Sequence, residues 1–197
     1  MRWSREVSTA PATEPVSTAD AKAHLKIDTS DEDALIDSWV VAARILIEEN
    51  CNISLITQTL KLRMDRFPLD GERIMLPAPP AISVATVEYY DSDGVLQTWA
   101  DSNYTLSPHN RPATMSTAYN VSYPTTRSID DAVIITYDAG YGDSVDVPAN
   151  IIHAIKLLLS LWNEAREAAC PVNLSAIPFG VKQLLAGNKI YFRGPTI

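Results

Sequence analysis

The stretch Val147–Glu167, VPANIIHAIKLLLSLWNEARE, is the segment around which the rest of the chain is organised. Its polar residues recur at steps of three and four, which places them on one narrow stripe of a helix. The rest of this helix is apolar, so several of its faces must be covered by other parts of the protein or by a neighbouring subunit. Each buried Leu or Ile contributes roughly 1.5 to 3 kcal/mol. The polar stripe consists of His153, Lys156, Ser160, Asn163, Glu164 and Glu167.

Two further helices are predicted on the N-terminal side of this segment. Ser17 can cap a short helix, because Asp20 stands in the capping-box position three residues later. Ser30 and Asp33 repeat this arrangement and open a longer helix, Asp31–Glu49, with an apolar stripe at helical spacing. On the C-terminal side, residues 179–186 predict a short helix that Gly187 and Asn188 end.

From Leu55 onward the period of the apolar residues changes to two, which is typical of strands with one buried and one wet face. The turn sequence Asp91-Ser92-Asp93-Gly94 lies between two such runs and predicts a β-hairpin. The expected strands are Leu55–Asp65, Arg73–Leu76, Ile82–Tyr90, Val95–Trp99, Asn103–Leu106, Ala113–Met115 and Val133–Tyr137.

These patterns predict an α+β fold, namely a mainly helical unit that carries an antiparallel β insertion. The helical unit is expected to contain two N-terminal helices, the long central helix and a short C-terminal helix. Pro11 and Pro15 exclude regular helix at the N-terminus and favour an extended arm there. The expected divisions are an extended arm over 1–15, a helical domain over 16–50 and 147–186, a β insertion over 51–146, and a C-terminal tail over 187–197.

The charge of the chain argues against a protein whose main task is to bind nucleic acid. The 197 residues carry 16 basic and 24 acidic side chains, a net charge of −8. Residues 151–197 differ, with five basic and two acidic side chains. A basic C-terminal segment and an acidic neighbouring surface would favour a head-to-tail contact between copies, which closes into a ring if the rotation allows.

Cys51 and Cys170 are far apart and form no metal or redox motif, so ordinary thiols in a reducing cytoplasm are expected. The N-terminus has no apolar run of the length that a signal peptide needs, and no later segment approaches a membrane span. The chain is therefore expected to be soluble and intracellular, with no contact to membranes.

The search for catalytic chemistry finds no recognisable motif, and no catalytic, cofactor-binding or metal-binding residues are predicted. His24, His109 and His153 lie in three different elements, without a Ser/His/Asp or metal-binding arrangement. One alternative is a small metal-dependent enzyme that uses the acidic cluster at Asp28–Asp33. That cluster lacks the Gly and Glu of an EF-hand loop, and acidic residues are common at a helix N-terminus without any ion.

A DNA-binding module is the other alternative. The aromatic residues of the β region could stack on bases, but their neighbours are acidic rather than basic, so packing between strands is favoured. These aromatic residues are Tyr89, Tyr90, Trp99 and Tyr104.

The order and spacing of several segments resemble one protein family along most of the chain. This family is the head-to-tail connector or adaptor proteins of long-tailed bacteriophages, prophages and gene transfer agents. The segments are EPVSTADAKAHLKID (14–28), DEDALIDSWVVAARILIEE (31–49), LITQTLKLRMDRFP (55–68), LPAPPAISVATVEYYDSDG (76–94), VIITYDAGYGD (133–143), VPANIIHAIKLLLSLWNEARE (147–167) and IPFGVKQLLAG (177–187).

The resemblance implies a structural protein without catalytic residues or cofactors. Such adaptors form a ring, usually of twelve copies, under the portal protein, extend the DNA channel and receive the stopper or tail-terminator protein. DNA passes through the lumen without sequence recognition. Assembly takes place in the bacterial cytoplasm, after which the ring is part of the particle neck. The resemblance makes 187–197 a docking tail for the portal, with Lys189, Ile190, Tyr191, Phe192 and Arg193 as candidates, and His153, Lys156, Ser160 and Glu164 are candidates for the subunit interface.

Overall fold

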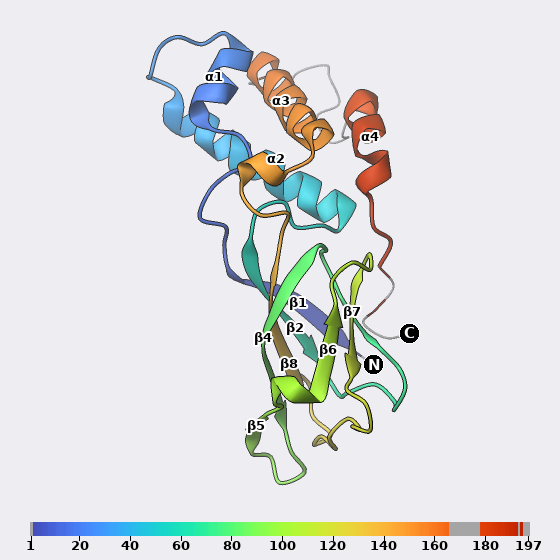
Figure 1. The fold of residues 1–197 in the computed structure, drawn as a ribbon. Coiled ribbons are helices and arrows are strands. Elements are labelled where there is room, and N and C mark those ends of the chain that lie inside the picture. The colour runs from blue at the N-terminus through green and yellow to red at the C-terminus, as the bar shows by residue number, and fades with distance from the viewer. Residues whose placement is uncertain (1, 166–177, 193, 195–197) are drawn as a thin grey trace. The chain divides into compact units, whose positions relative to one another are not determined.

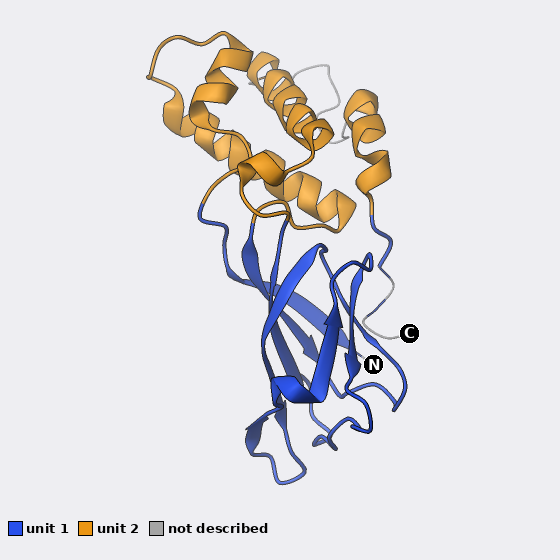
Figure 2. Cartoon of the chain, viewed as in Figure 1, with its two compact units in different colours: residues 1–12, 57–140, 190–197 blue, residues 13–56, 141–189 orange. Residues whose placement is uncertain are grey.

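The computed structural model describes residues 2–165, 178–192 and 194 of the chain. These residues divide into two compact units, which Figure 2 colours separately. The β unit comprises the described residues of 1–12, 57–140 and 190–197, and the helical unit those of 13–56 and 141–189. Each unit is therefore assembled from chain segments that are distant in sequence.

The β unit contains a five-stranded antiparallel sheet with the strand order β1-β2-β8-β4-β5 (Figure 1). The central strand β8 pairs with β2 on one side and with β4 on the other. Along β2 and β8 every second residue is buried, because one face of these strands lies against the core and the other does not. The strands are β1 Trp3–Thr9, β2 Gln58–Met64, β4 Ala81–Tyr90, β5 Leu96–Thr98 and β8 Val133–Ala139.

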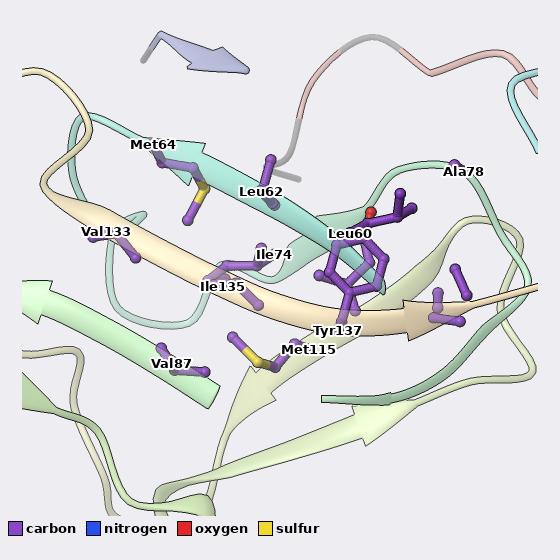
Figure 3. Packing of buried hydrophobic residues seen from close by; sticks show 14 of the residues in the cluster. Leu60, Leu62, Met64, Ile74, Ala78, Val87, Met115, Val133, Ile135 and Tyr137 are labelled. Atoms are coloured by element: carbon purple, nitrogen blue, oxygen red, sulfur yellow. The ribbon is translucent and has the colours of Figure 1, made fainter. Parts of the chain in front are cut away.

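A smaller antiparallel sheet of three strands has the order β3-β7-β6. These strands are β3 Ile74–Leu76, β6 Tyr104–Ser107 and β7 Ala113–Thr117. The two sheets contribute side chains to one apolar core, which Figure 3 shows at close range. Its fully buried members include Leu60, Leu62 and Met64 of β2, Ile135 and Tyr137 of β8, Ile74 and Leu76 of β3, and Met115 of β7.

Tyr137 is the largest fully buried side chain of this core, and its hydroxyl donates a hydrogen bond of 2.6 Å to the carbonyl oxygen of Pro77. Burial raises the pKa of Tyr137, so the phenol stays a neutral donor. We expect Tyr137→Phe to lower the free energy of unfolding by about 1 to 3 kcal/mol, because a buried acceptor loses its donor. Urea denaturation measures this change. Tyr119→Phe, at a side chain that is 92% exposed, is the control and should change nothing.

The helical unit consists of α1 Thr18–Leu25, α2 Asp33–Cys51, α3 Ala149–Glu164 and α4 Phe179–Leu185, with α3 packed against the other three (Figure 1). Ser17 caps α1 as predicted, since its hydroxyl accepts a hydrogen bond of 3.1 Å from the N–H of Asp20. Both N-terminal helices end in a left-handed residue, Lys26 and Asn52, whose N–H bonds back to a helix carbonyl. Short 3-10 turns lie at Asp101–Asn103, Ser144–Asp146 and Ala186–Asn188.

The predicted central helix is α3, and one face of it is buried. The buried residues recur at the spacing of a helix face that lies against other helices. The opposite face carries the polar stripe. The buried residues of α3 are Ile151, Ala154, Ile155, Leu158 and Leu159.

The prediction of a mainly helical unit with a single β insertion is wrong. The described residues form eight strands in two antiparallel sheets beside four α-helices, so the protein is rich in β-structure. The N-terminal segment, expected to be an extended arm, contributes β1, which pairs with β2. None of the seven side chains of β1 is buried, and only Trp3 and Val7 are apolar. Because strand prediction relies on buried alternating residues, this segment carried little signal.

Candidate assembly surfaces

The candidate interface residues of α3 lie on the side of the helix that faces away from its buried side. His153 and Glu164 are exposed, whereas Lys156 and Ser160 are half-buried. The hydroxyl of Ser160 lies 3.0 Å from Nε2 of His24 on α1, so this residue is engaged within its own unit. The described part of the stripe therefore offers two exposed groups, one of them a carboxylate, and a partly covered lysine. These are residues that can contact another molecule, but they form no catalytic arrangement.

A buried ionic network in the helical unit was not foreseen from the sequence. Arg44 of α2 donates hydrogen bonds of 2.8 Å to the carboxylates of Glu14 and Glu48. Glu48 also accepts a 2.8 Å hydrogen bond from the N–H of Leu55. Burial raises the pKa of Glu48, although the Leu55 N–H and the Arg44 guanidinium oppose the rise. The spacing of Arg44 and Glu48 by four residues was the available signal, because such pairs share a helix face.

The C-terminal candidates do not form one cluster. Lys189 and Tyr191 are exposed, Tyr191 to 82%, whereas Ile190 and Phe192 are half-buried. The ring of Phe192 meets Trp3 of β1 edge to face, with the ring centroids 5.0 Å apart. Arg193 lies outside the described residues. Phe192 thus serves as an anchor on the β unit, and the lysine and tyrosine remain accessible.

The acidic cluster at Asp28–Asp33 does not gather around a common point. Among the described residues, no three His, Cys, Asp or Glu side chains are placed to hold a metal ion. The carboxylate of Asp33 instead pairs with the ammonium of Lys22 at 2.6 Å. This pair holds α1 and the start of α2 together, which is a structural task.

The double variant Asp31→Asn/Asp33→Asn tests this interpretation. We expect its thermal midpoint to fall only slightly, because a partly exposed ion pair contributes about 0.2 to 1 kcal/mol. Size-exclusion chromatography should give the wild-type profile. A large loss of stability together with a calcium- or magnesium-dependent midpoint in the wild type would contradict the structural interpretation.

One group of aromatic residues in the β unit packs together, namely Phe67, Tyr89, Trp99, Tyr104 and Tyr123. Trp99 and Phe67 are each only 6% exposed, and their rings lie 5.4 Å apart. Tyr123 stacks on Phe67 at 5.3 Å, and burial raises its pKa to about 12. Stacking on bases needs accessible ring faces, so Trp99 is no platform for nucleic acid.

Most of the chain matches a known protein family. The sequence model of the family described as HCP, head completion protein, matches residues 15–169. The chain belongs to the head completion protein family. The match covers α1 to α3 and the β-structure between them, and it leaves out β1 and α4. It confirms the resemblance drawn from the order of the sequence segments and identifies a structural head-to-tail protein.

Solved structures share the fold of this head completion protein over nearly its whole length. A chain in the neck of an empty gene transfer agent particle, computed with C6 symmetry, is 24% identical with a TM-score of 0.79, covering 96% of this chain and 97% of that one. A chain of the native gene transfer agent virion is 24% identical with a TM-score of 0.77, covering 96% of both chains. A third chain comes from the neck of the native gene transfer agent particle, computed with C12 symmetry. It is 23% identical with a TM-score of 0.74, and the match covers 98% of this chain and 97% of that one. No curated protein sequence matches the chain.

Membrane insertion through a helix finds no support in the described part of the head completion protein, since no helix there combines the necessary length and apolar character. The longest described helix, α2, contains charged residues on its own buried side, including Arg44 and Glu48.

Proposed function

We propose that this head completion protein is an adaptor whose copies assemble into a ring, of twelve subunits, beneath the portal of a phage or gene transfer agent particle. The ring extends the DNA channel and receives a stopper or tail-terminator protein. The family match over residues 15–169 carries this proposal, and the fold shared with neck proteins of C6 and C12 particles supports it. The role is structural and requires no catalytic residue or cofactor.

Contacts between neighbouring subunits involve the outer side of α3. His153 and Glu164 are exposed there, and Leu157 and Leu161 beside them are half-buried in the single chain. Lys156 and Ser160 lie between these groups. A neighbouring subunit that covered this side would bury the remaining apolar surface of the helix, which is favourable by about 25 cal/mol for each Å².

Docking on the portal involves the C-terminal segment from Lys189 to Arg193. Lys189 and Tyr191 are exposed, and tyrosine is enriched at interfaces because it combines a large apolar ring with a polar tip. Phe192, near the end of the segment, packs against Trp3. An exposed aromatic group on an anchored segment suits a protein contact better than one on a free tail, because less conformational entropy is lost on binding.

Electron microscopy of the protein together with its portal tests the proposed function. The two proteins are co-expressed, purified through a tag on the portal, and imaged. We expect a ring of copies on one face of the portal. Absence of the protein from purified portals, combined with a failure to form rings at any concentration tried, would overturn the proposal.

DNA that passes through this ring is not held by it. The net charge of −8 predicts no phosphate-driven binding of the isolated protein. In an electrophoretic mobility assay with duplex DNA at low salt, we expect no shift. A tight complex that weakens steeply with salt would favour a DNA-binding module instead.

A further inference from the structure

Among the described residues, no strand pairs with the outer edge of β1. This strand stands at the end of the five-stranded sheet, and all seven of its side chains are exposed. The N–H of Asp65 donates to the carbonyl oxygen of Arg2, so these residues form a hydrogen-bonded pair of the antiparallel ladder. Because such pairs alternate with non-bonded ones, the backbone groups of Trp3, Arg5 and Val7 point away from β2.

One face of β1 is also only partly covered by the residues that the structure describes, among which Phe192 packs on Trp3. Trp3, Arg5 and Val7 lie opposite Met64, Leu62 and Leu60 of β2, whose side chains enter the core. Residues opposite each other in a ladder share a face of the sheet. The core-facing side of β1 is nevertheless exposed, with Trp3 at 38% and Val7 at 54%.

A second open edge lies on the opposite side of the same sheet. The strand β5 covers only the end of β4, where it pairs with residues 88–90. The part Ala81–Thr86 pairs with β8 on its inner side and, among the described residues, has no strand on its outer side. Two bulges interrupt its register with β8, but it contains no charged residue and no proline, the other features that protect a sheet edge from pairing.

We propose that β1 of one copy pairs with the open edge of β4, residues 81–86, in the next copy, so that the sheets join around the ring. This inference rests on the ring proposed above. Two different edges meet in this contact, which makes it heterologous, as a ring requires. The lengths suit each other, since the regular part of β1, Trp3–Val7, has five residues before its register with β2 shifts, and the open part of β4 has six.

The direction of the strands agrees with this pairing. Each neighbouring pair in the order β1-β2-β8-β4 is antiparallel, so β4 runs opposite to β1 within one chain. Successive copies in a twelve-membered ring are rotated by only about 30°, a full turn divided by twelve, so each strand keeps its sense from copy to copy. The new pair is therefore antiparallel, like the rest of the sheet.

Val7→Pro tests the contact through the backbone. Proline removes the outward N–H of this residue and leaves the ladder with β2 intact, which an edge strand tolerates. We expect an unchanged circular dichroism spectrum and the loss of ring assembly, measured by mass photometry with and without the portal. Val7→Thr keeps the N–H and the β-branched shape, and it should assemble. Normal rings formed by a folded Val7→Pro variant would overturn the pairing.

Photocrosslinking identifies the partner strand directly. Benzoylphenylalanine replaces Val7 in full-length protein, and copies with this substitution are mixed with ¹⁵N-labelled wild-type copies so that mass spectrometry recognises links between subunits. We expect links to peptides that contain residues 81–87. Links between copies that fall only elsewhere would overturn the assignment of β4. If the wild type forms no rings, the proposed function fails. If rings form without this link, only the strand pairing fails.

Discussion

Leu158→Ala is expected to lower the free energy of unfolding of the isolated protein by about 2 to 5 kcal/mol. Leu158 is 1% exposed and lies in the middle of the buried face of α3. Truncation to Ala removes buried apolar surface and leaves a cavity that neighbouring side chains fill only in part. Urea denaturation at a low protein concentration, where copies do not associate, measures this change.

Leu157→Ala is the matched control for this variant. Leu157 has the same chemistry and the neighbouring position, but it is half-buried on the outer side of the helix. We expect a smaller loss of stability than at Leu158, together with weaker ring assembly. An unchanged stability of Leu158→Ala with assembly lost would contradict the structure, since it would assign Leu158 to a subunit interface.

Arg44→Met is expected to destabilise the helical unit by about 3 to 5 kcal/mol at neutral pH. The substitution removes the guanidinium from between Glu14 and Glu48, which leaves the buried carboxylate of Glu48 without its cation. Methionine fills much of the same volume, so a loss of this size reports the uncompensated charge rather than a cavity. Thermal and urea denaturation both measure it.

The pH dependence of Arg44→Met provides a second measurement. Burial already raises the pKa of Glu48, and removal of Arg44 raises it further. A carboxyl whose pKa is higher in the folded state binds more protons folded than unfolded, so stability falls as the pH rises through the folded pKa. The deficit of the variant should therefore shrink as the pH is lowered and Glu48 becomes protonated. A deficit that is constant from acidic to neutral pH would contradict this explanation.

Arg63→Met is the control for the buried network. Arg63 and Glu6 form an ion pair of the same 2.8 Å length on the surface of the β unit. Because exposed pairs are screened by water and salt, we expect the denaturation midpoint to stay almost unchanged. The comparison separates the effect of burial from the effect of the ion pair itself.

The helices and most of the strands could be predicted because their side chains alternate between a core and a wet face. The apolar positions of α3 and the two-residue period of β2 both follow from burial within a single chain. The edge strand β1 could not be predicted in this way. Its order depends on backbone pairing with a strand that lies beyond two helices in the sequence, and no periodicity records that contact.

The buried network was beyond prediction for a related reason. The sequence places Arg44 and Glu48 on one helix face, but it does not show that Glu14 and the N–H of Leu55 close around them. The candidate interface residues of α3 show the same difference between a position on a helix face and a contact with a distant segment. The polar stripe of α3 could be seen in the sequence, whereas the engagement of Ser160 with His24 could not.

The strand order β1-β2-β8-β4-β5 also determines when the large sheet can form during synthesis. β1 leaves the ribosome first, but its partner β2 follows both N-terminal helices. Two parts of the sheet can form early, the ladder of β1 with β2 and the hairpin of β4 with β5. They are joined only when β8, the last of these strands to be made, pairs with both β2 and β4. Contacts between residues far apart in sequence form slowly. The nascent chain consequently exposes the inner edges of β2 and β4 until β8 joins them, so β8 completes both the sheet and its protection from premature pairing with other chains.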